Sequence, residues 1–240
     1  MPQVLNTGER ILPEKESPLM TARHLCAYEF AGRFVKGKAV LDIGCGEGYG
    51  SHYLAGSAKN VTGIDYSKEA IEHAKNKYPL DNLAFYSVNI KELDSIKDKF
   101  DIICSFQVIE HLEDPGGFLG NVKGLLSPGG VFICSTPNRL DASPNSDKPA
   151  NRFHVKEYLF DEFMLLLGEY FDSVEPLGLK RGRRLNLNRR LKKIGLFNFL
   201  PDCINPVKRF YSGIGCGNFI YIKNNLDTAL DFIVVCRGLI

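Results

Sequence analysis

The sequence predicts an α/β protein built on a doubly wound parallel sheet, and three observations support this class. Short apolar runs that suit buried strands alternate with stretches that carry apolar residues at helical spacing. A glycine-rich turn lies within VLDIGCGEGYG, residues 40–50, directly after the first apolar run. The 240 residues are 44% hydrophobic and 24% charged, as in ordinary globular proteins, so a sizeable core can form without disulfides or metals.

The expected elements follow one another in a regular order. Strands are expected at 39–44, 60–65, 83–89, 101–109, 129–137, 217–223 and 229–238, and helices at 21–35, 50–58, 67–78, 116–126 and 155–171. Thr21 is the expected N-cap of the first helix and Ser67 that of the third, because both hydroxyls precede apolar residues at helical spacing. Only NNLDTA separates the last two strands, so we expect them to form a hairpin.

Composition divides the chain into four parts. We expect an N-terminal segment with a lid helix at 1–37, the core at 38–177, a basic insertion at 178–210 and the final hairpin at 211–240. The insertion holds ten Lys and Arg residues and one acid, a net +9, whereas the whole chain has 30 basic and 28 acidic residues. The remainder therefore has 20 basic and 27 acidic residues, a net −7, and this asymmetry needs an explanation.

Several protein classes are not expected. The first residues lack the basic and apolar regions of a signal peptide, and no apolar run approaches the about 18 to 20 residues that span a bilayer. Seven cysteines are scattered without a CxxC pair, which indicates small core residues in a reduced, cytoplasmic protein. The net charge of +2 points to no particular partner.

The glycine loop has the wrong pattern for a phosphate ligand. A dinucleotide fingerprint needs a third glycine where Tyr49 stands, and the Gly-Lys-Ser/Thr of a P-loop is missing. Asp42 and Glu47 would repel phosphate but would suit a cationic ligand. Asp65 ends the second expected strand, 21 residues after Gly44, where an acid can accept both hydroxyls of a ribose. A ribose, a cation and no phosphate together describe S-adenosylmethionine.

Four segments in order now carry a specific resemblance. VLDIGCGEGYG, GIDYS, FDIICSFQVIEHLEDP and LSPGGVFICSTPN resemble the successive motifs of class I S-adenosylmethionine-dependent methyltransferases, over about residues 38–175. The resemblance implies a Rossmann-like sheet of seven strands with the last strand antiparallel, and it implies that the N-terminal helix serves as a lid.

The same resemblance assigns the cofactor contacts by position. It assigns them to Asp42, Gly44, Gly46, Gly48, Asp65, Tyr66, Asn89, Ile90, Phe106 and Gln107. The three glycines would line the methionine part, Asp42 would orient its ammonium, and Asp65 would take the ribose hydroxyls. Asn89 stands where the family often has an acid near the adenine amine. Phe106 and Gln107 would face the methionine part and the methyl group of the cofactor.

Two histidines are the candidates for acceptor chemistry. His111, in VIEHLEDP, and His154, in NRFHVKEY, follow the fourth and fifth strands and face the acceptor space in this fold. A hydroxyl acceptor profits from a base with a pKa near neutrality, for which histidine is suited. The segments NxFHVxEY and LDTALDFIVVCR also resemble a bacterial subgroup linked to surface glycans, which implies O-methylation of a small-molecule or sugar acceptor. His24 lies on the expected lid helix.

Two alternatives use the same residues. Glu110, His111 and His154 resemble the metal set of small-RNA 2′-O-methyltransferases, E-x-x-E-H with later histidines. Here Gln107 occupies the first position and the second late histidine is missing, so no metal is expected and nucleic acid is not the favoured partner. The other alternative is a non-catalytic protein that binds the cofactor and recruits a partner through its basic segment.

The basic segment leaves three interpretations open. Leu187, Leu191 and Ile194 recur at helical spacing among arginines and lysines, so this helix could lie on an anionic lipid surface. It could equally bind phosphate on a nucleotide-sugar, a lipid-linked acceptor or RNA. In the third interpretation the leucines are buried against the core and the charges are solvated.

Overall fold

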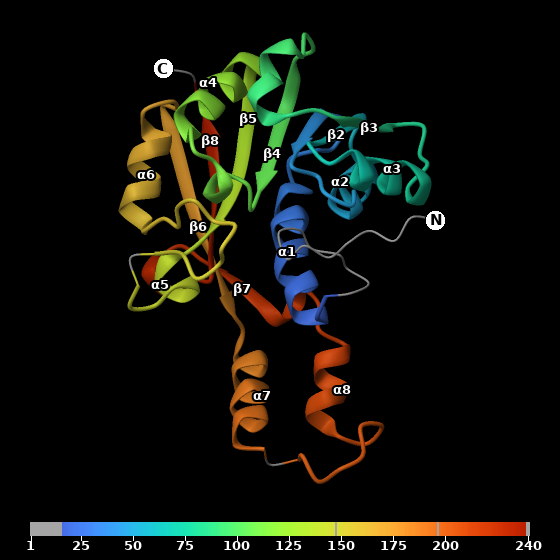
Figure 1. Cartoon of the computed structure of the whole chain (residues 1–240), viewed down its shortest axis with the longest axis vertical. Helices are drawn as coiled ribbons and strands as arrows, with labels where there is room; N and C mark the ends of the chain where they lie inside the picture. The colour runs from blue at the N-terminus through green and yellow to red at the C-terminus, as the bar shows by residue number, and fades with distance from the viewer. Residues whose placement is uncertain (1–15, 147, 196, 239–240) are drawn as a thin grey trace.

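A single mixed sheet of eight strands forms the centre of the computed structural model, which describes residues 16–146, 148–195 and 197–238 (Figure 1). The strands are β1 Ala39–Ile43, β2 Asn60–Asp65, β3 Leu83–Ser87, β4 Phe100–Phe106, β5 Leu126–Pro137, β6 Ser173–Arg181, β7 Phe219–Ile222 and β8 Asp231–Arg237. Their spatial order is β3-β2-β1-β4-β5-β8-β6-β7. The expected α/β class is confirmed, with one strand more than the seven that were expected.

The helices alternate with the first five strands as expected. The α-helices are α1 Pro18–Ala31, α2 Tyr49–Ala55, α3 Lys68–Lys77, α4 Pro115–Leu125, α5 Arg139–Ala142, α6 Phe160–Gly168, α7 Arg183–Ile194 and α8 Pro206–Ser212, with short 3-10 helices η1 Ile90–Ser95, η2 Ile109–His111, η3 Cys216–Asn218 and η4 Leu226–Thr228. Ser67 caps α3 as predicted. The prediction for Thr21 is wrong, because Ser17 caps α1 through the Met20 amide, and Pro18 begins the helix. Residues 1–15 of the predicted N-terminal segment lie outside the described residues.

Two hydrophobic layers cover the two faces of the sheet. Along β1, Leu41 and Ile43 face a cluster with α4 and α6, whereas Val40 faces a cluster with α1 and α2. This alternation follows from the two-residue period of a strand, and both faces of β1 are buried. The carboxyl ends of the parallel strands β1, β2 and β4 therefore meet at one edge, where strand order reverses between β1 and β4.

The predicted terminal hairpin is wrong. β8 lies between β5 and β6 and is antiparallel to both, whereas β7 pairs with β6 at the sheet edge. Six of the seven residues of β8 are buried, and such a strand needs a neighbour on each side to satisfy its backbone. The antiparallel last strand itself is confirmed.

β6 is a strand that the sequence did not predict. Its sequence, SVEPLGLKR, contains a proline, a glycine and a charged end, which are poor strand signals. Gly178 lets the chain pass the neighbouring loop, since a Cβ there would stand 2.8 Å from the Cβ of Ala229. The basic segment predicted from residue 178 therefore starts inside this strand.

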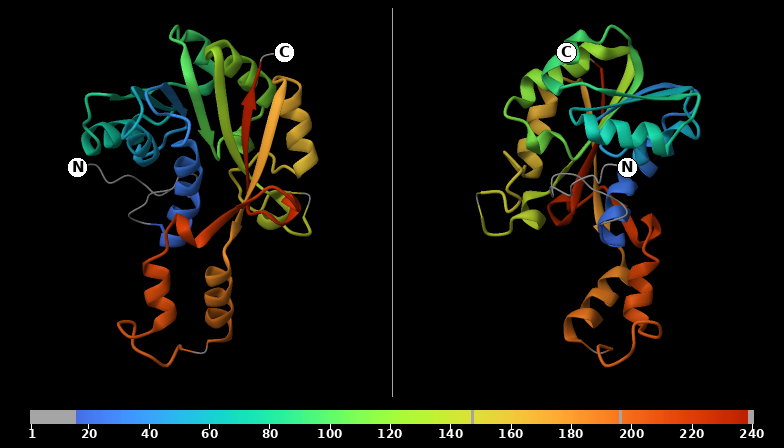
Figure 2. Two further views of the ribbon diagram at one scale, coloured as in Figure 1. Left: turned by 180° about the vertical axis from the view of Figure 1, so that it is seen from behind. Right: turned by 45° about the vertical axis from the view of Figure 1, so that its right-hand side comes forward.

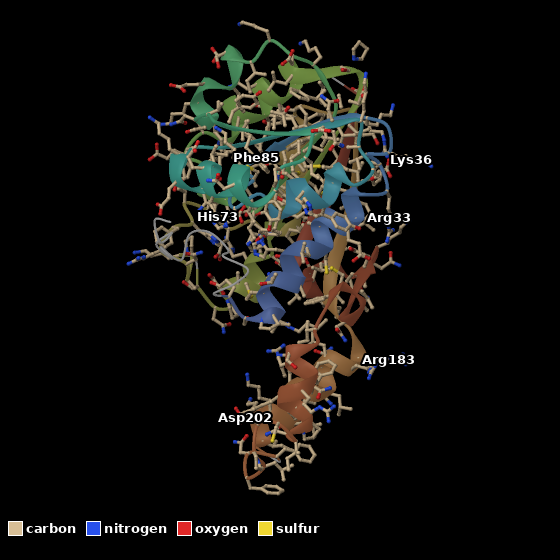
Figure 3. All side chains as sticks on the ribbon, turned by 90° about the vertical axis from the view of Figure 1, so that its right-hand side faces the viewer. Arg33, Lys36, His73, Phe85, Arg183 and Asp202 are labelled. Atoms are coloured by element: carbon tan, nitrogen blue, oxygen red, sulfur yellow. The ribbon has the colours of Figure 1, made fainter. Side chains whose placement is uncertain are left out.

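The helices α7 and α8 project together from the body of the molecule. Figures 1 and 2 show them side by side beyond the end of the sheet, and Figure 3 places Arg183 and Asp202 on this projection, away from His73 and Phe85. We call residues 183–195 and 197–212 the arm. Leu185 in α7 and Val207 in α8 are buried, and Lys192 Nζ lies 4.7 Å from the Tyr211 ring centroid, which joins the two helices. None of the described helices has the length and apolar character needed to cross a membrane.

Candidate functional site

A cavity of about 1010 Å³ opens at the carboxyl ends of β1, β2 and β4. Among the residues predicted to contact the cofactor or the acceptor, it is lined by Gly44, Gly46, Asp65, Tyr66, Asn89, Ile90, Phe106, Gln107, His111 and His154. Asp42 and Gly48 are the two predicted site residues that do not line it. The cavity is therefore shared between the predicted cofactor end and the predicted acceptor end.

The first two glycines of the loop face the cavity with bare backbone. Gly44 has φ +78°, and a Cβ there would stand 2.4 Å from Val108 Cγ2. Gly46 has φ +51°, and the place of its missing Cβ is open space. Both left-handed conformations favour glycine. A ligand can therefore approach the chain at Gly46 as closely as the sequence predicts for the methionine part of the cofactor.

The last two glycines serve packing instead. A Cβ on Gly48 would stand 2.7 Å from Ala74 and from the Phe85 ring, on the side of α3 and β3. A Cβ on Gly50 would stand 2.0 Å from the Tyr28 ring of α1. Gly48 does not line the cavity, and core packing by itself accounts for glycine at this position, so its contact with the cofactor stays a prediction.

Asp42 lies behind the cavity wall. Its carboxylate is fully buried and accepts hydrogen bonds from Ser51 Oγ at 2.6 Å and Tyr28 Oη at 3.4 Å. Burial raises its pKa to about 7. The predicted role of Asp42, to orient the cofactor ammonium, often through water, stays a prediction, and its hydrogen bonds anchor α1 and α2 to β1.

Asp65 stands at the end of β2, as predicted for the ribose contact. Its carboxylate accepts from the Gly46 amide at 3.0 Å and from the Ser67 amide at 2.9 Å, which ties the glycine loop to the next helix. Each carboxylate oxygen can accept more than one hydrogen bond. The residue lines the cavity, so the arrangement fits a ribose diol beside the exposed backbone of the loop.

The predicted adenine and methyl contacts also lie on the cavity wall. Asn89 caps η1, with Oδ1 accepting from the Lys91 amide at 3.0 Å, so part of its predicted acceptor capacity is used locally. Gln107 ends β4 at φ +57°, an unusual conformation for a residue with a side chain and one that clusters at functional sites. Its Nε2 donates to Ser135 Oγ at 3.3 Å, and the Phe106 ring meets Tyr28 edge-on at 4.8 Å.

Helix α1 supplies a wall that the sequence only partly indicated. Arg23 lines the cavity and pairs with both oxygens of Asp231 on β8, at 2.7 and 2.6 Å, while its Nη2 also donates to the Leu230 carbonyl. His24 lines the cavity as well, and burial lowers its pKa to about 4, so the ring is neutral. The Arg23–Asp231 pair joins residues 208 positions apart, and no sequence signal reveals it.

The acceptor end gathers Glu110, His111 and His154. One potential ligand atom from each lies within 4.8 Å of the other two, and the two imidazole centroids are 4.9 Å apart. Glu110 is fully buried, and Thr136 Oγ1 donates to its Oε2 at 3.1 Å. Burial raises the pKa of Glu110 to about 8. The sequence named all three residues, but only as an alternative set.

Hydrogen bonds assign the tautomers of both histidines. The Phe153 carbonyl can only accept, so His111 Nδ1 donates to it at 2.9 Å, and the neutral form of this ring has its lone pair on Nε2. His154 Nδ1 lies 2.7 Å from Glu157 Oε1, and Nε2 lies 3.0 Å from Asn151 Nδ2. Asn151 Oδ1 accepts from the Phe153 amide at 3.1 Å, which turns the amide NH₂ of Asn151 toward His154. His154 Nε2 is therefore an acceptor and Nδ1 a donor, as in a neutral imidazole.

Known proteins are similar to this chain in sequence and in fold. A family described as "Methyltransferase domain" matches residues 34–165. A probable S-adenosylmethionine-dependent methyltransferase of Mycolicibacterium smegmatis is 38% identical over 181 residues, which are 75% of this chain and 70% of that protein. A ubiquinone biosynthesis O-methyltransferase of Coxiella burnetii is 39% identical over 107 residues, which are 44% of this chain and 46% of that one.

Similarity among solved structures supports the fold. The N-methyltransferase NodS of Bradyrhizobium japonicum, in complex with S-adenosylhomocysteine, aligns with a TM-score of 0.61 and 17% identity over 93% of this chain and 89% of that one. The bare backbone at Gly46 and the acid at the end of β2 fit the same cofactor. The chain belongs to the methyltransferase domain family, and it is an S-adenosylmethionine-dependent methyltransferase of the Rossmann-like class I.

Proposed function

We propose that this enzyme transfers the methyl group of S-adenosylmethionine to a hydroxyl of a small-molecule or sugar acceptor. The observation that carries the proposal is the pair of imidazoles, His111 and His154, that line the same cavity as the predicted cofactor residues. The cofactor supplies a methyl group on a sulfonium, which is already a good leaving group. The chain's own residues therefore need to orient the acceptor and to accept the proton of its hydroxyl group.

Methyl transfer to a hydroxyl releases one proton, and this is why a hydroxyl acceptor suits a site with imidazoles. The acceptor oxygen forms the new bond to the methyl carbon, the sulfur keeps the electrons of the broken bond, and one proton leaves the hydroxyl. An imidazole with a lone pair on Nε2, as assigned to His111, can assist that loss. The name of the Coxiella burnetii relative as an O-methyltransferase agrees with this acceptor atom.

Polar side chains beyond the histidines support a sugar-like acceptor. Glu113, Asp114, Asn121 and Asn151 also line the cavity. Carboxylates and amides in this number suit an acceptor with several hydroxyls better than an apolar ring. Methyl transfer to simple glycosides, but not to catechols or quinols, measured by mass spectrometry of the product, is the expected result. Transfer only to the phenolic compounds would contradict the sugar proposal.

Substitution of the histidines tests the proposed chemistry. His111→Ala and His154→Ala should keep S-adenosylhomocysteine affinity, measured by calorimetry, and lower kcat by about 10²- to 10⁴-fold. His52→Ala is a matched control, because His52 is exposed and stacks on Tyr78 at 4.6 Å, outside the cavity. Unchanged kcat in both histidine variants would contradict their role. Cofactor binding without methyl release to any acceptor would favour the non-catalytic alternative.

We also propose that the arm binds an anionic lipid surface, where a lipid-linked or phosphate-bearing acceptor would be found. Leu187, Ile194, Phe199 and Ile204 are 56%, 69%, 79% and 57% exposed. These apolar side chains project among Arg189, Arg190, Lys192 and Lys193, all of them exposed. Exposed apolar groups beside cations are typical of segments that lie in a membrane interface. Burial of these side chains against the core is not what the structure shows.

Vesicle binding tests the arm. The enzyme should co-sediment with phosphatidylglycerol vesicles, release steeply as salt rises, and bind phosphatidylcholine vesicles weakly. Phe199→Ser, and Arg189→Glu with Arg190→Glu, should each reduce binding severalfold. Leu165→Ser is the control, since Leu165 on α6 is 72% exposed but lies outside the arm. Equal binding to both vesicle types, or binding only to RNA, would contradict the proposal.

A further inference from the structure

We propose that Glu110, His111 and His154 bind one divalent cation at the acceptor end of the cavity. The inference rests on the proposed function, because the cation would meet the same acceptor hydroxyl. Glu110 and His111 come from η2, after β4, and His154 comes from the loop between α5 and α6. All three line the cavity, and their potential ligand atoms lie within 4.8 Å of one another.

The donor set has the composition of a known class of open metal site. Two imidazoles and one carboxylate can occupy one face of a cation and leave the remaining positions for water or substrate oxygens. Imidazole nitrogen and carboxylate oxygen together suit borderline divalent ions such as Mn²⁺, Fe²⁺, Co²⁺ and Zn²⁺ better than Ca²⁺. The open positions would face the space where the proposed acceptor hydroxyl enters.

The outer contacts of both imidazoles match those of metal-binding histidines. A histidine that ligates through one nitrogen usually donates the other N–H to a carboxylate or a backbone carbonyl. His154 Nδ1 meets the buried carboxylate of Glu157 at 2.7 Å, and His111 Nδ1 meets the Phe153 carbonyl at 2.9 Å. Each ring donates through Nδ1, so its neutral form would have the lone pair on Nε2, which is the state that a metal requires.

Glu110 supplies an independent observation. Its side chain is fully buried, and Oε1 has no hydrogen-bond partner among the described residues, although Oε2 accepts from Thr136. Buried carboxylate oxygens without a partner are costly and call for an explanation. A cation between this oxygen and the two imidazoles would satisfy it.

Binding would require a small closure of the cluster. Ligand atoms around a single ion at metal–ligand distances of about 2.1 Å stand roughly 3 to 3.5 Å apart. The three groups would therefore draw together from their present positions, and the Asn151 amide would release His154 Nε2. Asn151 is then a competitor for the lone pair, so its removal should not weaken the site.

A cation in this position would change how the acceptor proton is handled. A hydroxyl oxygen bound to a divalent ion loses its proton far more easily than a free hydroxyl, so water could receive the proton. The imidazoles would act by holding the ion. The methyl transfer would otherwise balance as before, with the carbon–sulfur bond replaced by a carbon–oxygen bond.

Metal uptake by the 240-residue chain tests the proposal. Chelator-stripped protein dialysed against Mn²⁺, and separately against Zn²⁺, should bind one equivalent, measured by atomic emission. Glu110→Gln and His111→Gln should each weaken binding at least tenfold, since Gln in place of Glu110 can still accept from Thr136. Asn151→Ala should bind equally well or more tightly, and His52→Gln should match the wild type.

The outcomes separate this inference from the proposed function. No stoichiometric uptake of either ion, or equal uptake by Glu110→Gln, would overturn the cation site, with calorimetry of S-adenosylhomocysteine binding to show that each variant is folded. Full methyl transfer in stripped protein with excess chelator would also overturn it and leave the function intact. One bound ion without methylation of any hydroxyl would support the site and contradict the function.

Discussion

The two ends of the cavity are built in different ways. The cofactor end comes from short segments where β1, β2, β3 and β4 terminate, so each contact is adjacent to a strand that the sequence reveals. The acceptor end joins α1, η2 and the loop before α6, which approach one another only in the folded chain. A local motif can therefore identify the cofactor, whereas the acceptor chemistry depends on contacts between distant segments.

The largest expected effect tests how the acceptor end is held. Arg23→Gln leaves Asp231 without its bidentate partner in a buried setting, where the side chains of Arg23 and Asp231 are 17% and 5% exposed. Breaking such a pair should lower the free energy of unfolding by about 3 kcal/mol, measured in urea. Arg23→Gln combined with Asp231→Asn should recover much of this loss. Equal loss in the single and double variants would show that α1 is held by apolar packing alone.

A matched pair of glycines sharpens the comparison at the cofactor end. Gly46 and Gly37 both have positive φ, +51° and +69°, and a Cβ on either meets nothing within 4 Å. Valine at either position should therefore cost similar backbone strain, about 1 to 2 kcal/mol. Gly46→Val should also weaken S-adenosylhomocysteine binding by about a hundredfold, roughly 2.7 kcal/mol, because only Gly46 faces the cavity. Equal affinity in both variants would remove Gly46 from the site.

The last expected effect is a pH dependence that comes from Asp42 behind the cofactor end. Burial raises its pKa from 3.8 to about 7, so the folded state holds this proton more tightly than the unfolded state. The associated stability is present below about pH 4 and is lost as pH rises through 7. Asp42→Asn does not titrate, so its unfolding free energy relative to wild type should rise steadily between pH 4 and pH 7 and level off above pH 7. A constant difference across that range would show that Asp42 is ionised throughout.

Particular elements show how far local patterns reach. β2 spans Asn60–Asp65 as predicted, and Ser67 caps α3, because strand burial and a capping hydroxyl act over a few residues. The cap at Ser17, the strand β6 and the separation of β7 from β8 were not predicted. Proline and glycine in β6 are tolerated because neighbouring strands supply the pairing, which a propensity argument does not include.

The candidate site shows the same contrast between features set by neighbouring residues and features set by distant segments. Of the cofactor contacts that the family resemblance implies, Gly44, Gly46 and Asp65 line the cavity, whereas Gly48 and Asp42 turn toward packed side chains. Asn151 and Glu157 both belong to the segment NxFHVxEY, but no role could be assigned to either from the sequence. Their importance comes from facing the two nitrogens of His154.

The sequence by itself determined the α/β class, the cofactor and the strand ends that meet it, because the hydrophobic period and the glycine loop act over neighbouring residues. Only the tertiary structure decided which strand lies between β5 and β6, which glycines face a ligand, and which groups surround the two histidines. The physical reason is that these features depend on the approach of segments far apart in the chain, where burial, and not spacing, decides the partner.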